Sequence, residues 1–244
     1  DCTDAHLILW YIQPGRIHLF SILMHKSLKH ILTFIFISVG IYFLAGVVIA
    51  TFNLEEEIIN VVNFRGGYGY SLKRYNHVDK VSDVDICFLG SSHAYRGFDP
   101  RIFEKYGYSS YNLGSSNQTP MNSYFLLKKY VDELEPEYVV MESFWGPFNS
   151  RGSESALDLI CNTTPDIKSL RMAVETKDIM VINTFMVETV KSILNKRSKK
   201  QHQYNKDQYL HSGFVETSRK MEPGNYKSYN SEITIDPPLE EQLM

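Results

Sequence analysis

The feature that most constrains this chain is a long uncharged stretch near its start, residues 31–52. Its sequence is ILTFIFISVGIYFLAGVVIATF. About 20 apolar residues in a helix are enough to cross the roughly 30 Å hydrocarbon core of a bilayer. A buried helix of a globular core is the alternative, but such a helix normally carries a polar stripe and this stretch has none. We therefore expect a transmembrane helix over residues 31–52.

The charges on either side of this stretch predict its orientation. Lys26 and Lys29 precede it, and three glutamates at 55–57 follow it. Short basic flanks stay in the cytoplasm. The stretch is also longer than a signal-peptide core, and no small-residue cleavage site follows it. The sequence therefore predicts a single-pass signal anchor in the cytoplasmic membrane, with residues 1–30 inside and the C-terminal domain extracytoplasmic.

The first residues fit this pattern poorly. Residues 1–23 are of mixed character and precede Met24, after which the basic flank begins. Our hypothesis is that Met24 is the native start and that residues 1–23 are not native.

The composition of the whole chain is that of one folded domain with extensions. The chain of 244 residues is 43% hydrophobic and 22% charged, and its formal charge is −3. This balance argues against a nucleic-acid partner, because phosphate contacts need a basic face. The three cysteines have neither CxxC nor Cys/His spacing, so no disulfide framework or zinc site is indicated. We expect neither a metal nor a cofactor.

Short apolar runs alternate with helical signals from residue 84 onwards. Strands are predicted at 84–90, 108–113 and 137–144. Asp99 and Thr119 each precede a proline, which is the pattern of an N-cap and first helical turn. Such alternation predicts right-handed parallel crossovers and an α/β fold, a flavodoxin-like doubly wound sheet with both faces covered.

This pattern sets the expected domain limits. Residues 53–83 should connect the membrane helix to an α/β domain over 84–244, in which 155–197 is helical and 198–244 is mostly irregular. In doubly wound sheets, ligands bind at the carboxyl ends of the strands. The segments that follow the three strands, 90–93, 114–118 and 142–149, are therefore the expected site.

The first of these segments carries a family resemblance. Gly90-Ser91-Ser92 resembles the first block of the SGNH (GDSL-like) hydrolase superfamily, which ends in the nucleophilic serine. Serine replaces the aspartate of that block, as in the D-alanyl transfer proteins of teichoic acid modification. The resemblance covers residues 80–150 and is to the membrane-anchored envelope type that includes O-acetyl transfer proteins. It implies an SGNH-like fold, with Ser92 as nucleophile and its backbone N–H as an oxyanion donor. A capping or turn serine is the alternative.

The other blocks of the family match less well. The second block implies that the Gly114 N–H contributes to the oxyanion hole. The third block normally ends in Gly-x-Asn, which is absent here. Asn149 is a loose substitute for its asparagine, and Asn117 and Gln118 are alternative donors.

The last block, Asp-x-x-His, is absent from the sequence. Asp207 and His211 are one residue too far apart to match it. Three hypotheses remain open: the block is encoded downstream of Met244, Asp207 and His211 serve despite their spacing, or the chain is a pseudo-enzyme. An unactivated serine is a weak nucleophile, so the predicted site is incomplete as written.

Two further side chains near these strand ends are candidates for substrate binding. His93 directly follows Ser92, so its side chain should diverge from that of Ser92 and is not expected to be the base. Glu142 lies at the end of the third strand, where it is either a site carboxylate or a hydrogen-bonded loop residue. Asn117 and Gln118 complete the predicted substrate-binding set, and Ser91 is expected to be structural.

These observations predict a membrane-anchored serine esterase or acyltransferase that acts on acylated cell-envelope glycans through an acyl-enzyme on Ser92. Its expected partners are an envelope polysaccharide or acylated glycan and a membrane acyl-transfer protein. The alternative is a catalytically inactive glycan-binding or scaffolding protein of the envelope. A third hypothesis takes the Gly-Ser-Ser-His turn as an anion cradle at a helix N-terminus.

Overall fold

A computed structural model describes residues 14–58, 60–200 and 206–220, with the backbone alone over 14–26 and at residue 56. By internal contacts the chain divides into two units, residues 1–45 and 46–244.

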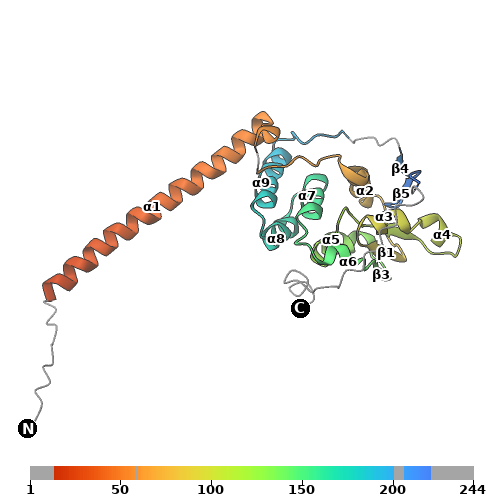
Figure 1. Cartoon of the computed structure of the whole chain (residues 1–244), viewed down its shortest axis with the longest axis horizontal. Helices are drawn as coiled ribbons and strands as arrows, with labels where there is room; N and C mark the ends of the chain where they lie inside the picture. Colours follow the sequence, from red (N-terminus) through yellow and green to blue (C-terminus); the bar gives the residue numbers. More distant parts are fainter. Residues whose placement is uncertain (1–13, 59, 201–205, 221–244) are drawn as a thin grey trace, which may run out of the picture. The chain divides into compact units, whose positions relative to one another are not determined.

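The described residues of the first unit, 14–45, belong to one long helix. Helix α1 (Pro14–Phe52) is continuous, as Figure 1 shows, and it begins on a proline, whose fixed φ suits the first helical turn. Its Ser27–Phe52 segment is long and apolar enough to cross a membrane, and few of its residues are buried. The predicted apolar helix over 31–52 is therefore present. Residues 1–13 of the predicted N-terminal segment lie outside the described residues.

The second unit is built on a small parallel sheet. Its strands are β1 (Ile86–Leu89), β2 (Ser110–Asn112) and β3 (Tyr138–Met141). They are parallel, and their order is β2-β1-β3, so β1 is central. The predicted α/β class and all three predicted strands are confirmed, although each strand is shorter than its apolar run.

Two of the three helices between the strands, α4 and α5, begin where the sequence predicts. Helices α3 (Ser92–Gly97) and α4 (Pro100–Glu104) connect β1 to β2, and α5 (Pro120–Leu134) connects β2 to β3. The Asp99 side chain accepts a hydrogen bond from the Arg101 N–H at the start of α4. At the start of α5, Thr119 and Asn122 form a reciprocal capping box.

A helical layer follows the sheet. The predicted helical region consists of α7 (Ser153–Asn162), α8 (Ile167–Glu175) and α9 (Ile179–Ile193), after the single turn of α6 (Trp145–Phe148). Within the region expected to be mostly irregular, β4 (Asp207–Tyr209) and β5 (Val215–Thr217) form a two-stranded antiparallel sheet. Residues 221–244 of that region lie outside the described residues.

The predicted connector, residues 53–83, is in part a component of the domain. It contains two single-turn 3-10 helices, Glu55–Glu57 and Tyr68–Tyr70, and helix α2 (Ser71–Val78). Leu72, Tyr75 and Val78 of α2 are buried. Their spacing of three residues is helical, but polar neighbours hide it in so short a helix. The domain therefore begins well before residue 84.

The core lies between the sheet and the helices α2, α5 and α7. Its apolar side chains include those of Tyr75, Val78, Cys87, Leu89, Tyr111, Leu113, Leu126, Leu134, Leu159 and Ile160. Burial raises the pKa of the Cys87 thiol to about 12, so this side chain is a neutral strand residue.

The expectation that both sheet faces are covered is wrong at β3. All four residues of Tyr138–Met141 are exposed. Their apolar run resembles a buried strand, but β3 is an edge strand and the helix that follows it, α6, is a single turn. Helices α7, α8 and α9 pack on one another, and α5 and α2 contact this layer.

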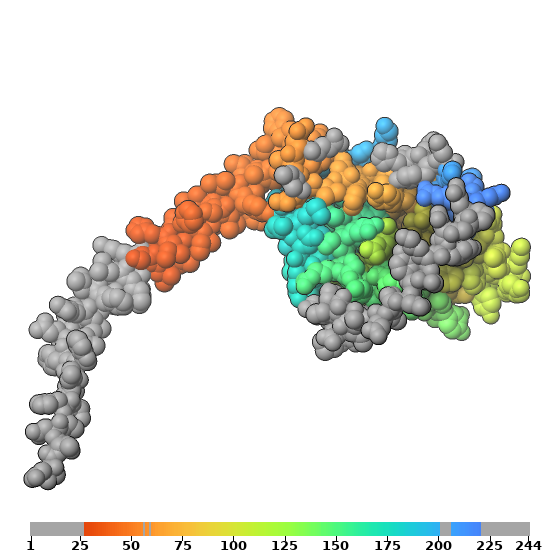
Figure 2. Space-filling model, viewed as in Figure 1, coloured from red at the N-terminus to blue at the C-terminus, as the bar shows by residue number. Residues whose placement is uncertain are grey.

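The second unit also includes the last turns of α1. Ala50 is buried in a small apolar cluster with Val61 and Val187, with Ile49 and Val190 packed against it. In Figure 2, α9 (cyan) lies directly beside these turns (orange). Residues 46–52 are therefore part of the domain's packing.

Candidate functional site

The site is organised by a glycine at the end of the central strand. Gly90 follows β1 with φ 137°, a conformation that residues with side chains rarely adopt. A Cβ at this position would lie 2.7 Å from the Glu142 Cβ. Glycine therefore allows the chain to turn directly beneath Glu142, which follows β3.

Ser91 joins this turn to Glu142. Its N–H donates to Glu142 Oε2 at 2.9 Å, and its hydroxyl donates to the same oxygen at 2.8 Å. The other oxygen, Glu142 Oε1, accepts the Phe144 N–H at 2.5 Å. Ser91 is also the N-cap of α3, since its Oγ accepts the His93 N–H at 3.2 Å. These bonds tie the ends of β1 and β3 together.

The same hydroxyl orients the exposed His93 ring. Nδ1 of His93 lies 3.1 Å from Ser91 Oγ. A hydroxyl has one proton, and that of Ser91 is given to Glu142, so His93 Nδ1 must be the donor in this contact. In the neutral ring the Nε2 lone pair is then the free acceptor. The ring edge also packs on Phe144, with centroids 4.5 Å apart.

Ser92 differs from its neighbour. It is the first residue of α3 and is only partly buried. Its hydroxyl has no hydrogen-bond partner within the part of the chain that the structure describes. Of the two serines, Ser91 is structural, as predicted, and Ser92 has the free hydroxyl.

The end of β2 lies beside the end of β1. The Ser115 N–H donates to the Gly90 carbonyl at 3.0 Å, which brings Gly114 next to the turn. The Gly114 N–H itself donates to the Asn112 side chain at 3.0 Å, so an oxyanion would have to compete with that bond. The two predicted strand ends are thus brought together, but the predicted donor is already occupied.

The other side chains predicted to donate to an oxyanion differ in their exposure to solvent. Gln118 is buried, and its amide accepts from Ser115 and donates to Ser123. Asn117 is partly exposed in a left-handed turn, with φ 49°. Asn149 is exposed and follows the last residue of α6. Only Asn117 and Asn149 have exposed side chains.

Asp207 and His211 are not arranged as a catalytic pair in the described residues. The Asp207 carboxylate lies 2.9 Å from an Arg96 nitrogen and 3.3 Å from an Arg219 nitrogen. His211 Nδ1 lies 3.1 Å from Ser212 Oγ and 3.8 Å from Glu104. Asp207 therefore helps to hold α3 against β4 rather than to orient an imidazole.

A buried cation supports the β2 end of the site. Arg74 of α2 is fully buried and donates to the carbonyls of Gly213 and Gly114, while its guanidinium stacks on the Tyr95 ring at 4.4 Å. This residue was not predicted to be functional, because a single arginine in a short helix carries no pattern. Its bonds fix the carbonyl side of Gly114.

An acid near this cation is also buried. The Asp158 carboxylate accepts hydrogen bonds from Ser71 at 2.8 Å and from Asn162 at 2.9 Å. Burial raises its pKa to about 6, and the hydrogen bond from Ser71 and the charge of Arg74 oppose the rise. The Asp158 carboxyl near Arg74 therefore titrates in a mildly acidic range.

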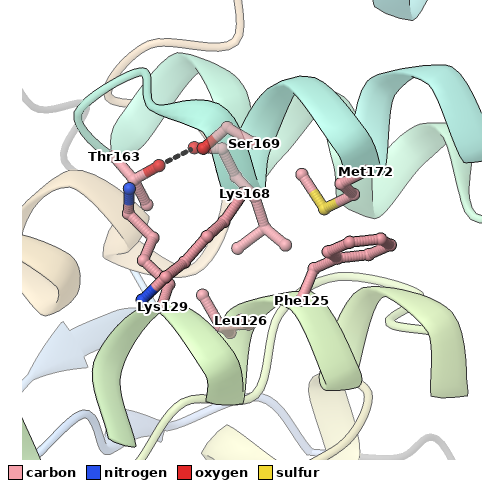
Figure 3. Close-up of a pocket in the computed structure, with 8 residues that line it drawn as sticks. Phe125, Leu126, Lys129, Thr163, Lys168, Ser169 and Met172 are labelled. Carbon is pink, nitrogen blue, oxygen red and sulfur yellow. Dashed lines mark hydrogen bonds between the residues drawn. The ribbon is translucent and has the colours of Figure 1, made fainter. Parts of the chain in front are cut away.

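A small hollow between α5, α7 and α8 contains none of the predicted site residues. Figure 3 shows its lining: Phe125, Leu126, Lys129, Leu159, Thr163, Lys168, Ser169 and Met172. The Lys129 ammonium is 2.6 Å from Asp166 and 2.7 Å from the Thr164 carbonyl. We regard this hollow as a packing feature of the helical layer.

Comparison with protein-family models, with curated proteins and with solved structures finds no match to this chain. At the carboxyl ends of its parallel strands, the chain carries the Ser92 hydroxyl, which has no partner among the described residues, and the exposed His93 ring, which is held by the Ser91 hydroxyl.

Proposed function

We propose that this chain is a membrane-anchored serine esterase or acyltransferase that acts on acylated cell-envelope glycans through an acyl-enzyme on Ser92. The single observation that carries the proposal is the contrast between the two serines. Ser91 is committed to Glu142, whereas the Ser92 hydroxyl is free at the end of the central strand. In α/β proteins, ligands bind at the carboxyl ends of the strands, where Ser92 lies.

We also propose that the small sheet belongs to a flavodoxin-like, SGNH-like fold. The strand order β2-β1-β3 is the order with which a flavodoxin-like doubly wound sheet begins. An SGNH-like domain has this arrangement, so the strand order supports the family resemblance of Gly90-Ser91-Ser92.

The proposed reaction has two steps. Ser92 Oγ forms a bond to the ester carbonyl carbon, and the alcohol leaves as its bond to that carbon breaks. Water or a sugar hydroxyl then takes the acyl group and releases the serine. The proton of Ser92 ends on the departing alcohol in the first step, and the proton of the water or sugar hydroxyl returns to Ser92 Oγ in the second.

Exposed aromatic side chains support a glycan as substrate. Phe144 and Trp145 are exposed beside His93, with their ring centroids 5.6 Å apart. Amphipathic aromatic rings of this kind supply contact area for the apolar faces of sugars. They lie next to the tethered His93, so a bound sugar hydroxyl would meet the free Nε2 acceptor.

The apolar helix α1 supports a location of this protein in the membrane. We propose that the uncharged stretch 31–52 of this helix crosses the cytoplasmic membrane once and that the domain is extracytoplasmic, because Lys26 and Lys29 precede the stretch and glutamates follow it. An envelope polysaccharide and a membrane acyl-transfer protein are the partners that this location favours.

Covalent labelling by a fluorophosphonate probe tests the proposal. The full chain in detergent micelles should be labelled, and Ser92→Ala should lose the label. Ser143→Ala is the matched control and should keep the label, because this exposed serine near the same strand ends has no part in the proposed acyl-enzyme. A folded wild-type chain that takes up no label would overturn the catalytic assignment.

A second candidate is a non-catalytic glycan-binding protein. It is favoured by the Gly114 N–H and the Gln118 amide, which are already hydrogen-bonded within the chain and leave few donors for an oxyanion. This candidate predicts glycan binding that Ser92→Ala leaves unchanged and that Trp145→Ala abolishes.

A further inference from the structure

A polar groove opens between α2, the second half of α5 and the loop that connects α7 to α8. Its volume is about 280 Å³, and its lining consists of polar and charged side chains around Tyr75 and Tyr130. Asn76, Asp79 and Glu133 of this lining are exposed, so the groove is open to solvent. A water molecule occupies about 30 Å³ of the liquid, so the groove has room for a small organic molecule.

The groove lies at the opposite edge of the sheet from Ser92. Helix α5 leaves the carboxyl end of β2 and returns to the amino end of β3, and the groove is beside its second half. The Leu134 carbonyl at the end of α5 accepts the Val84 N–H, which precedes β1. Ser92 follows the other end of β1, and this strand alone spans about 13 Å at 3.3 Å per residue. The groove is therefore separate from the site around Ser92.

Tyr130 contributes a polar group that the protein leaves unpaired. Its side chain is only 6% exposed, and its ring stacks on that of Tyr75. Its hydroxyl has no hydrogen-bond partner in the part of the chain that the structure describes. The oxygen is not among the enclosed polar atoms that lack a partner, so it reaches the groove that Tyr130 lines. This nearly buried phenol therefore has its hydrogen-bonding capacity available to a ligand.

Three carboxylates surround this hydroxyl from separate elements. Burial raises the pKa of the Tyr130 phenol well above its ordinary value, and the nearby carboxylate charges act in the same direction; they belong to Asp79, Asp166 and Glu133. The Lys129 ammonium holds Asp166 at 2.6 Å. The other two carboxylates make no ion pair or hydrogen bond with another described residue. The groove thus presents a protonated phenol as donor and two free carboxylates as acceptors.

This combination of groups narrows the class of ligand. Free carboxylates disfavour an anion, and an apolar molecule would leave the phenol and the carboxylates without partners. The described residues contain no group of three or more His, Cys, Asp or Glu side chains that could hold a metal ion. A hydroxyl both donates and accepts, so the adjacent hydroxyls of a sugar satisfy carboxylates and a phenol together.

We propose that the groove binds a sugar unit of a neutral glycan through Tyr130, Asp79 and Glu133. Hydroxyls of the sugar donate to the two carboxylates, and Tyr130 Oη donates to a sugar oxygen. That this glycan is an envelope polymer rests on the proposed function, whereas the sugar chemistry of the groove does not. A second attachment point away from Ser92 keeps a polymeric substrate on the domain between reactions and raises the local concentration of its acyl groups.

Saturation-transfer NMR titrations with the full chain in lipid nanodiscs test the groove. Nanodiscs avoid detergents with sugar headgroups, which would compete. The probes are three neutral disaccharides: cellobiose, maltose and N,N′-diacetylchitobiose. Tyr130→Phe removes only the hydroxyl and should weaken binding roughly three- to tenfold, and Glu133→Gln should weaken it roughly tenfold, because hydrogen bonds to charged groups are stronger. Glu175→Gln, at an exposed position of α8 outside the groove, is the control and should bind like the unsubstituted chain.

All titrations are made in the Trp145→Ala background, which removes the exposed aromatic contact near the strand ends. Binding that persists there and weakens in Tyr130→Phe supports the groove, whether or not Ser92 takes up a fluorophosphonate. Loss of all binding in this background would overturn the groove. Equal affinities for Tyr130→Phe, Glu133→Gln and the control would also overturn it, as would binding of spermidine, an organic cation, in place of the three disaccharides.

Discussion

The Glu142 carboxylate accepts two hydrogen bonds from Ser91 at one oxygen, and it accepts the Phe144 N–H at the other. One side chain therefore satisfies backbone groups that follow β1 and β3, which are distant in sequence. We expect Glu142→Ala to reduce the free energy of unfolding by about 2 kcal/mol, because two backbone donors lose their acceptor.

Urea unfolding in detergent measures this loss. Glu142→Gln should lose less, since its amide oxygen still accepts. Glu133→Ala, at an exposed position on α5, is the control and should change the value by less than about 0.5 kcal/mol. Equal stabilities for Glu142→Ala and the control would contradict the role given to this carboxylate.

Gly90→Ala should be strongly destabilising. The positive φ and the approach of the Glu142 Cβ to 2.7 Å leave no room for a methyl group. We expect a loss of more than about 2 kcal/mol. Gly97→Ala, in the same helix–turn region with no atom near the added Cβ, should be neutral or slightly stabilising. Similar thermal unfolding of the two variants would argue against the tight turn.

The buried ion pair of Glu55 and Lys191 should show strong coupling. Both side chains are buried, and the pair links α9 to the segment that follows α1. Lys191→Met alone should cost about 3 to 5 kcal/mol, because the Glu55 charge is left unpaired in the interior. The double variant with Glu55→Gln should regain most of this loss. A double-mutant cycle with no coupling energy would contradict a direct pair.

Asp158 should make the stability depend on pH. Its folded pKa of about 6 is above its ordinary value of 3.8, because of burial. Between about pH 4 and about pH 6 the folded chain therefore holds a proton that the unfolded chain releases, and stability falls with rising pH by about 3 kcal/mol.

Asp158→Asn removes this titration and keeps the shape of the side chain. The difference in stability between the variant and the wild type should grow in favour of the variant as pH rises through this window, and should be constant above it. Unfolding curves measured at several pH values test this, and a constant difference throughout would show that the carboxyl does not titrate there.

Local signals in the sequence predicted local structure well. Asp99 and Thr119 start helices because their side chains cap the backbone within three residues, so a short window contains the whole interaction. The parallel sheet was likewise predictable from alternating apolar runs. The apolar helix before Phe52 is evident from composition alone.

Interactions between distant segments were not predictable in this way. Ser91 and Glu142 are 51 residues apart, and neither has a motif that indicates the other. Arg74 is fully buried, although its polar side chain suggests a surface position. Exposure of β3 was missed for a related reason, since an apolar run does not reveal whether a covering helix is long enough to reach it.

The packing of Val187 and Val190 against Ala50 also determines at which residue a soluble fragment of this protein can begin. A soluble fragment that starts after Phe52 would lack the helix turns that cover this part of α9, and it would expose an apolar strip and tend to aggregate. A fragment that starts at Gly46 keeps that cover. The practical boundary between anchor and domain therefore lies inside the helix and not at its end.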